Sequence, residues 1–427
     1  MKNIILLCFC CFIFLFVKSQ SQPKSDNLSD VDKAYILAKF CAEVKYNYIF
    51  YNDLKFDWDS LCQATLPSLL DTKSYNEYLS GLRRLCAKLG DGHTYITGNA
   101  PNKADWIRPL PMITKRIGNQ VFVEDVLSSL LKEKGIEKGV EIIQINDKSV
   151  SEYVDEYIRP FTASSTPQWL DYYPYSSFEL TKGQGSSPIK LLLKDKQGKT
   201  FSYESTRNLK WDIDVDRTFD YKVLDNNIGY LKIYGFMSNN FIQNFDKIYK
   251  EIEKTDGLII DLRDNTGGNS NFADYINRHL SNTPIKMGKW SSRMYIAAHG
   301  SWSYPQEWYM QTPHNLIPVK DKTIYTKPVT LLINAVTFSS SENFSVTFKG
   351  MKRGKIIGTR TGGSTGNPIS IDLGHSVYAQ ICTKNEWDTQ GNEFIGIGIK
   401  PDIEVEETSE IYSTGRDVVI EEALKHL

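Results

Sequence analysis

Three consecutive serines, Ser339, Ser340 and Ser341, follow an apolar run in the sequence N-A-V-T-F-S-S-S-E-N-F (334–344). A serine hydroxyl becomes a nucleophile only when a base beside it can take its proton. Serine is also a favoured helix N-cap, so a strand-to-helix turn without chemistry is the plainer interpretation of the same residues. The choice between the two depends on whether another part of the chain supplies a base.

The candidate base is a histidine in a glycine turn. His93 lies in L-G-D-G-H-T-Y-I (89–96), where two glycines flank an acid and the alternation after the histidine indicates a strand. A side chain on such a turn is well placed to project. A lone histidine is more often structural or solvated, and the other five lack a comparable setting. These five are His279, His299, His314, His375 and His426.

A second glycine turn can supply backbone amides. The buried run G-L-I-I-D-L-R (257–263) is expected to be a strand, and N-T-G-G-N-S (265–270) the turn after it. Amides of this turn, and the positive end of a helix beginning at the serines, can stabilise an oxyanion. The G-x-S-x-G elbow of α/β-hydrolases is absent, because no glycine lies within two residues of any of the three serines, and that fold is disfavoured.

An α/β core over residues 208–427 must position these groups. Strand-like and helix-like stretches alternate there, which predicts βαβ units around a mostly parallel sheet. The expected elements are strands at 228–233, 257–263, 329–333 and 356–359, and helices at 240–253, 272–280 and 340–349. Ligands of such sheets lie beyond the carboxyl ends of the strands, where both the glycine turn and the serines are expected.

Two further domains precede this core. Apolar residues at helical spacing predict a helical domain over residues 25–104, ending in the His93 turn. Residues 105–207 contain short strand-like runs, of which G-V-E-I-I-Q-I-N-D-K-S-V (139–150) resembles the G-D-x-I-x-x-I-N-G strand of PDZ domains. Val140 replaces the aspartate and Asp147 the last glycine, and an ordinary β-hairpin is the alternative. PDZ domains add extended C-terminal peptides to a sheet edge.

Composition and the N-terminus limit the possible partners. The 427 residues include 50 Lys+Arg and 51 Asp+Glu, a net charge of -1 without a long basic block, which argues against nucleic acid held by phosphate contacts. Residues 1–20 combine an early lysine, an apolar stretch and small Ser19, which indicates a secretory signal peptide. A membrane anchor is the competing interpretation, but the stretch is shorter than the ~20 residues of a spanning helix. We therefore expect export to the periplasm or the medium, with no membrane attachment after cleavage.

The cysteines leave two possibilities open. The mature chain would keep Cys41, Cys62, Cys86 and Cys382. In an oxidising compartment a disulfide among the first three can form, and buried free thiols are the alternative. No Cys/His cluster has zinc-ligand spacing, so no metal or other cofactor is expected.

Four segments taken together resemble the tail-specific, or C-terminal processing, serine peptidases. They are G-L-I-I-D-L-R-D-N-T-G-G (257–268), N-A-V-T-F-S-S-S-E-N-F (334–344), I-I-G-T-R-T-G-G-S-T-G (356–366) and G-I-G-I-K-P-D-I-E-V (396–405). The order of helical domain, PDZ-like module and α/β core is also that of the family. The resemblance covers nearly the whole mature chain and implies a crotonase-like peptidase core.

The resemblance also implies roles for residues. Ser339, the first serine of S-x-S-E, corresponds to the nucleophile, and Ser340 offers its backbone amide to the oxyanion together with Gly267 and Gly268. One branch of the family uses a lysine base from a loop after the serine, a known variant of nucleophile activation. The corresponding loop here, R-T-G-G-S-T-G-N-P (360–368), contains no lysine.

The tricorn-like branch of the family uses a histidine instead. L-G-D-G-H-T resembles its histidine segment, with His93 in the place of the base. An acid close before G-[VI]-x-P-D-I assists in that branch, but Ile395 stands about there, and the nearest carboxylate is Glu393. Asp91 is an alternative helper, although a turn-capping role is plainer. Three residues are expected to fix the glycine turn through hydrogen bonds: Asp261, Arg263 and Asn265.

The combined prediction is an exported serine endopeptidase. Its PDZ-like module would capture unstructured or C-terminal segments of polypeptides, and Ser339 and His93 would cleave them through an acyl-enzyme. The alternative is a non-catalytic peptide- or lipid-binding protein that keeps the peptidase fold, suggested by the missing lysine and the displaced acid. The sequence names neither the substrate nor the oligomeric state.

Overall fold

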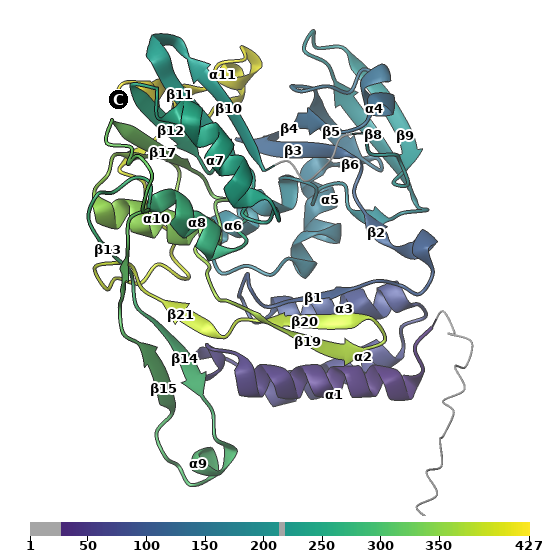
Figure 1. Cartoon of the computed structure of the whole chain (residues 1–427). Helices are drawn as coiled ribbons and strands as arrows, with labels where there is room; N and C mark the ends of the chain where they lie inside the picture. The colour runs from purple at the N-terminus through teal and green to yellow at the C-terminus, as the bar shows by residue number, and fades with distance from the viewer. Residues whose placement is uncertain (1–26, 213–217) are drawn as a thin grey trace, which may run out of the picture.

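The computed structural model describes residues 27–212 and 218–427 (Figure 1). The expected signal peptide, residues 1–20, lies outside the described residues. A helical N-terminal part, a β-rich module and an α/β core are arranged around a common centre. None of the helices in the described ranges has both the length and the apolar character needed to cross a membrane.

The N-terminal part is helical, as predicted. It contains α1 (Asp30–Asn47), α2 (Trp58–Leu70) and α3 (Tyr75–Ala87). The side chains of Ser29, Asp57 and Ser74 each accept a hydrogen bond from a backbone N–H in the first turn of the helix that follows. These caps satisfy donors that a helix start leaves without a partner, so the sequence itself fixes where each helix begins.

A hairpin from the other end of the chain completes the helical part. β1 (Tyr95–Gly98), which begins just after His93, pairs antiparallel with β20 (Val377–Ile381), and β20 pairs with β19 (Ile369–Gly374). Buried side chains of β19 and β20 share one core with the helices. Residues 369–381 therefore leave the α/β core, within which they were expected, and lie along α1 (Figure 1).

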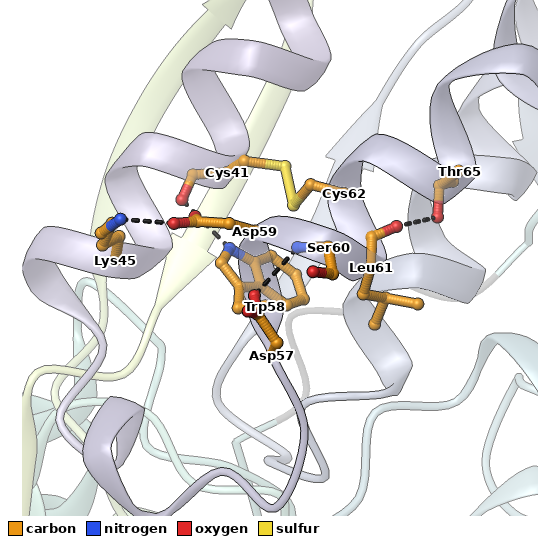
Figure 2. The surroundings of a disulfide bond; sticks show 9 residues. All are labelled: Cys41, Lys45, Asp57, Trp58, Asp59, Ser60, Leu61, Cys62 and Thr65. Carbon is orange, nitrogen blue, oxygen red and sulfur yellow. Dashed lines mark hydrogen bonds and ion pairs between the residues drawn. A yellow bond between two sulfur atoms is a disulfide. The ribbon is translucent and has the colours of Figure 1, made fainter.

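One disulfide links the first two helices. Cys41 of α1 is bonded to Cys62 of α2 (Figure 2). Beside it, the Trp58 indole N–H donates to the Cys41 carbonyl at 3.1 Å. Cys86 and Cys382 are buried free thiols. The described cysteines thus include both a disulfide and buried free thiols, the two possibilities that the sequence left open.

The β-rich module lies between the helices and the core in sequence. Its sheet has the order β3-β4-β5-β8-β9, and β6 (Lys148–Ser149) pairs with β5. The strands are β3 (Met112–Ile117), β4 (Gln120–Val126), β5 (Glu141–Ile145), β8 (Pro188–Lys194) and β9 (Thr200–Thr206). The helices α5 (Val150–Tyr157) and α6 (Pro167–Tyr172) connect β6 to the later strands. The module has its own buried apolar core, so its sheet is packed independently of the other two parts.

The α/β core is built on a six-stranded sheet in the order β10-β11-β12-β17-β18-β22. β10 runs antiparallel to β11, and the other four pairings are parallel, so the sheet is mixed and largely parallel. The strands are β10 (Phe219–Leu224), β11 (Ile228–Ile233), β12 (Gly257–Asp261), β17 (Val329–Ile333), β18 (Ile356–Gly358) and β22 (Ile403–Glu404). The helices are α7 (Phe241–Ile252), α8 (Ser270–Asn277), α10 (Ser340–Met351) and α12 (Val418–Leu424).

Both faces of this sheet are covered. Leu258 and Ile260 of β12 pack in the cluster that holds the phenylalanines of α7 and α10, whereas Ile259 packs in the cluster with α12 on the opposite face. Successive strand residues point to opposite faces, so a strand covered on both sides needs a continuous apolar run. The parallel pairing also brings the carboxyl ends of β11, β12 and β17 to one edge, where the glycine turn and the serines follow.

A small three-stranded sheet projects from the core. It has the order β15-β14-β21, with β14 (Trp290–Met294), β15 (Glu307–Gln311) and β21 (Lys384–Glu386). The short helix α9 (Ala297–Ser301) lies at the tip of the β14–β15 hairpin, which extends away from the rest of the chain (Figure 1). β21 lies at the inner side of this sheet, because Glu386 accepts a hydrogen bond from Asn343 of α10 at 2.9 Å.

Replacing both Cys41 and Cys62 by serine should lower the free energy of unfolding by roughly 3 kcal/mol, because the cross-link closes a loop of 21 residues and restricts the unfolded chain. Urea unfolding of the oxidised wild type and of the double variant would measure the difference. A reductant should weaken the wild type and leave the double variant unchanged. Equal stabilities under oxidising conditions would contradict this expectation.

Candidate active site

Ser339 stands between β17 and α10 in a backbone conformation that is rare for serine. Its φ of 57° and ψ of -125° lie in a region where a Cβ atom is strained. The turn is fixed from two sides: Ser339 N–H donates to the Ser364 carbonyl at 3.0 Å, and the Asn334 side chain accepts from two backbone N–H groups just before Ser339. Backbone strain that the surroundings impose in this way is typical of functional sites.

His93 reaches Ser339 across 246 positions of sequence. Its Nε2 atom lies 2.9 Å from Ser339 Oγ. The imidazole is only 5% exposed, and its ring stacks on Phe338 with a centroid separation of 4.7 Å and an interplanar angle of 7°. The structure therefore brings the predicted nucleophile and the predicted base within hydrogen-bond distance, with the ring held flat against its neighbour.

Ser364 holds the other ring nitrogen of His93. Its Oγ atom lies 2.7 Å from His93 Nδ1. Nε2 can accept the Ser339 proton only when Nδ1 carries the imidazole hydrogen, and the Ser364 hydroxyl can accept that hydrogen. The serine belongs to the R-T-G-G-S-T-G loop, the one in which the sequence comparison sought a lysine. That loop offers several hydroxyl and amide side chains, so the sequence alone does not single out Ser364.

The Glu342 carboxyl group fixes the loop that carries Ser364. It accepts hydrogen bonds from the Thr361 hydroxyl at 2.5 Å, from Gly363 N–H at 2.8 Å and from Ser364 N–H at 2.7 Å. Burial raises the pKa of Glu342 to about 8, against the lowering effect of these hydrogen bonds. In the sequence Glu342 is only the acid of the S-x-S-E motif; its contact with a loop some twenty residues later is a tertiary one, which the motif does not record.

The environment of His93 keeps its ring neutral. Burial lowers the pKa of His93, while the negative charges of Asp91 and Glu386 act in the opposite direction. Asp91 accepts from the Thr94 hydroxyl at 2.5 Å and from His93 N–H at 3.3 Å, so it caps the turn, the plainer of its two expected roles. A neutral imidazole is the form that can take a proton from a hydroxyl.

Two backbone N–H groups next to Ser339, those of Gly268 and Ser340, donate to no acceptor within the described chain. The Gly267 N–H is engaged, because it donates to Asn265 Oδ1 at 2.8 Å. Gly267 has a φ of 100°, and a Cβ atom there would lie 2.6 Å from the Ser339 Cβ. Of the three expected oxyanion donors, Gly268 and Ser340 have a free N–H. Gly267 has none to offer, but its lack of a side chain lets the turn lie close to Ser339.

The three expected supporting residues all lie at the glycine turn. Asn265 joins the turn to β11, since its Nδ2 donates to the carbonyl that ends this strand at 2.9 Å. Asp261 and Arg263 form a buried ion pair at 2.7 Å, and Arg263 also pairs with Asp417 at 2.7 Å. Burial alone would raise the pKa of Asp261, but the adjacent Arg263 guanidinium holds it well below its usual range. These contacts fix the end of β12 from which the turn starts.

Glu393, the predicted helper of His93, does not reach it. The chain turns back between Asp388 and Asn392, and Glu393 forms a backbone bridge to Trp387 with its side chain exposed. Both ring nitrogens of His93 are already bonded, to Ser339 and to Ser364. The expected contact between Glu393 and His93 is therefore not present, and the Ser364 hydroxyl bonds Nδ1 of His93 instead.

The β-rich module forms one wall of the site. Trp169 of α6 stacks on Phe338 at 4.1 Å, on the ring that also carries His93. The Thr166 hydroxyl donates to the Gly362 carbonyl at 2.7 Å, and the Ser165 hydroxyl accepts from Gly92 N–H at 2.9 Å. The segment before α6 thus bonds both the loop of Ser364 and the turn of His93.

The assembled groups are those that acyl transfer through a covalent intermediate requires. A hydroxyl bonded to a neutral imidazole is an activated nucleophile, and free N–H groups beside it can bind an oxyanion.

Across residues 27–212 and 218–427, no three His, Cys, Asp or Glu side chains are grouped so as to hold a metal ion.

Comparison with known proteins confirms the resemblance. Residues 227–405 match the model of peptidase family S41. A carboxy-terminal-processing protease of Bartonella bacilliformis is 26% identical over 250 residues, which cover 57% of this chain and 52% of that protein. A protein of Sulfurisphaera tokodaii described as a tricorn-like protease C-terminal subunit is 25% identical over 254 residues, 58% of this chain and 26% of that protein. The chain thus spans about half or less of these relatives.

Solved structures show the same fold. Mature CPAF complexed with lactacystin has a TM-score of 0.69 at 15% identity, with 93% of this chain and 98% of that chain covered. The photosystem II D1 C-terminal processing protease has a TM-score of 0.52 at 17% identity, with 89% and 94% covered. At these identities the likeness shows the fold alone, and it extends over nearly the whole chain.

The His93 imidazole should titrate below pH 6.5, because burial disfavours its charged form. The unfolded chain then binds this proton more readily, so His93 should lower the stability of the fold as pH falls below 6.5. Histidine C–H signals followed by NMR would give the midpoint, with His93→Gln identifying the signal. A midpoint at or above 6.5 would contradict the buried, neutral base.

Proposed function

We propose that the chain, whose residues 227–405 match the model of peptidase family S41, is an exported serine endopeptidase. The observation that carries the proposal is the 2.9 Å contact between His93 Nε2 and Ser339 Oγ. In this reaction His93 takes the Ser339 proton while the serine attacks a peptide carbonyl. His93 then protonates the leaving amine, and water attacks the acyl-enzyme by the same route in reverse.

The oxyanion of the tetrahedral intermediate accepts from Gly268 N–H and Ser340 N–H. Both donors are free, and each is held in place, Gly268 by its bridge to Phe236 and Ser340 by the start of α10, so they need no rearrangement as the charge develops. Ser340 begins α10, so the positive end of that helix adds to the stabilisation. Gly267 takes part through its conformation, since its own N–H is bonded to Asn265.

Ser364 is the positioning residue for His93. A hydroxyl on Nδ1 orients the ring and can accept its N–H, but it offers a dipole where other serine peptidases offer a carboxylate. The negative charges that favour the imidazolium come from Asp91 and Glu386, which act on His93 through space. His93 can therefore act as a base without a directly bonded acid, because Ser364 orients the ring and the two carboxylates supply the negative charge.

Polypeptides are the substrate class that this site fits. The β-rich module, residues 105–207 in our division, would act as a PDZ-like domain that captures unstructured or C-terminal segments, and residues 208–427 as a crotonase-like core. The six-stranded sheet with β3 at its edge supports the first assignment, and the parallel strands that alternate with helices in the core support the second. The signal-like residues 1–20 support a periplasmic or extracellular location.

The non-catalytic alternative has less support. It was motivated by a missing lysine and a displaced acid, and the contacts of His93 with Ser339 and Ser364 supply a base and its positioning group without either. A binding protein that had lost catalysis would not need a strained backbone at Ser339 or free N–H groups beside it.

Ser339→Ala should abolish cleavage of an unfolded protein such as casein while leaving the thermal unfolding temperature nearly unchanged. Ser341→Ala is the matched control, because the Ser341 hydroxyl is buried with no hydrogen-bond partner among the described residues. We expect the control to retain activity. Casein cleavage by purified Ser339→Ala at the wild-type rate would contradict the assignment of the nucleophile.

Ser364→Ala should lower kcat by roughly 10- to 100-fold with little change in KM, because the ring of His93 loses its orientation while the substrate contacts remain. Ser364→Thr keeps a hydroxyl and should recover part of the loss. Steady-state kinetics on a fluorogenic peptide would measure both variants. A change confined to KM, or equal kcat for alanine and threonine, would argue against a positioning role.

A further inference from the structure

The β14–β15 hairpin exposes an unusually apolar strand. Trp308, Tyr309 and Met310 of β15 are 44%, 50% and 48% exposed, and no residue of the strand is buried. β15 is also the outer strand of its sheet, which ends at this edge. Apolar side chains and an open strand edge occurring together mark an interaction site.

The pairing pattern shows which backbone groups are open. Trp387 N–H donates to the Lys289 carbonyl. Lys289 and every second residue after it, 291 and 293, therefore direct their backbone N–H and C=O groups toward β21. The backbone groups of residues 290, 292 and 294 then point toward β15, where they pair with those of Gln311, Tyr309 and Glu307. The remaining residues, Trp308 and Met310, direct their N–H and C=O groups outward, and their N–H groups find no acceptor in the described chain.

The strand lacks the usual protection of an edge. Proteins blunt open edges with lysine, proline, bulges or a covering loop. Glu307–Gln311 contains no lysine or proline, and its pairing with β14 is regular over all five residues. In Figure 1 the hairpin extends away from the body of the chain, so the edge is not covered by another element.

We propose that β15 pairs antiparallel with β15 of a second copy of this chain, about a two-fold axis at Tyr309. Trp308 of one copy then lies opposite Met310 of the other, and each pair exchanges two backbone hydrogen bonds between the outward-facing groups. Glu307 lies opposite Gln311, so no like charges meet. The two three-stranded sheets become one six-stranded sheet across the dimer.

The hairpin is held ready for this pairing. The Arg293 guanidinium donates to the Lys45 carbonyl at the end of α1 at 2.8 Å and lies over the rings of Tyr51 and Tyr295. Arg293, near the tip end of the β14–β15 ladder, thus bonds the hairpin to the helical part, so little ordering is left for association.

Two other occupants fit the edge less well. A lipid surface would match the aromatic side chains, but outward N–H and C=O groups cannot stay unpaired in hydrocarbon. A substrate peptide could add to the edge, but the strand has only one charged residue, Glu307, to select it. The self-complementary register therefore favours a second copy.

Tyr309→Cys tests the axis directly. At a two-fold axis Tyr309 meets itself in a pair without hydrogen bonds, where Cα atoms lie ~4.5 Å apart, within the range that a disulfide spans. Under a mild oxidant we expect a covalent dimer on a non-reducing gel. The control is Ser301→Cys at the exposed end of α9, which should stay monomeric on the gel, as should the wild type. Cross-linking of Ser301→Cys but not of Tyr309→Cys would overturn the proposal.

Met310→Pro tests the hydrogen bonds. Proline removes the outward N–H of Met310 without touching the ladder to β14, and the two-fold axis doubles the loss. Light scattering after size exclusion should give twice the chain mass for the wild type and for the control Met310→Val, and a dimer weakened at least ~10-fold for Met310→Pro. A wild type that stays monomeric up to ~100 μM, or that uses β15 only to bind casein or neutral phospholipid vesicles, would overturn the proposal.

Discussion

A single buried carboxyl group organises the site. Glu342, in the first turn of α10, binds three donors of the loop at 361–364 and so fixes where Ser364 stands. Ser364 then has two functions: its hydroxyl bonds the ring of His93, and its carbonyl accepts from Ser339 N–H. The His93 imidazole and the Ser339 backbone are therefore positioned by the same residue, and an error in the loop would displace both.

The arrangement requires all three parts of the chain. The helical part brings the His93 turn, the core brings Ser339 with the glycine turn, and the β-rich module inserts the segment from Ser165 to Trp169 between them. The stack of Trp169, Phe338 and His93 excludes water from one side of the imidazole. In a low-dielectric setting of this kind each hydrogen bond to the ring is stronger than it would be in water.

The sequence indicated much of this, and the reasons for its failures are physical. Ser339 and His93 could be found because each lies in a local pattern: a serine run after a buried strand, and a histidine between turn signals and a strand. Ser364 and the hairpin at 369–381 could not, because their partners are set by packing between segments nearly 300 positions apart, which no local period records. Glu393 was chosen by nearness in sequence to a motif, and the tight turn before it carries its side chain to solvent. The domain boundaries themselves stay a prediction.

The central claim is that Ser339 is a nucleophile activated by His93 through this loop. The most direct measurement is to treat the protein with a fluorophosphonate, digest it and locate the adduct by mass spectrometry, in the wild type and in His93→Ala. We predict one modified serine, Ser339, with labelling in His93→Ala slowed by at least ~100-fold. Labelling at another serine, or at the same rate without His93, would contradict the account.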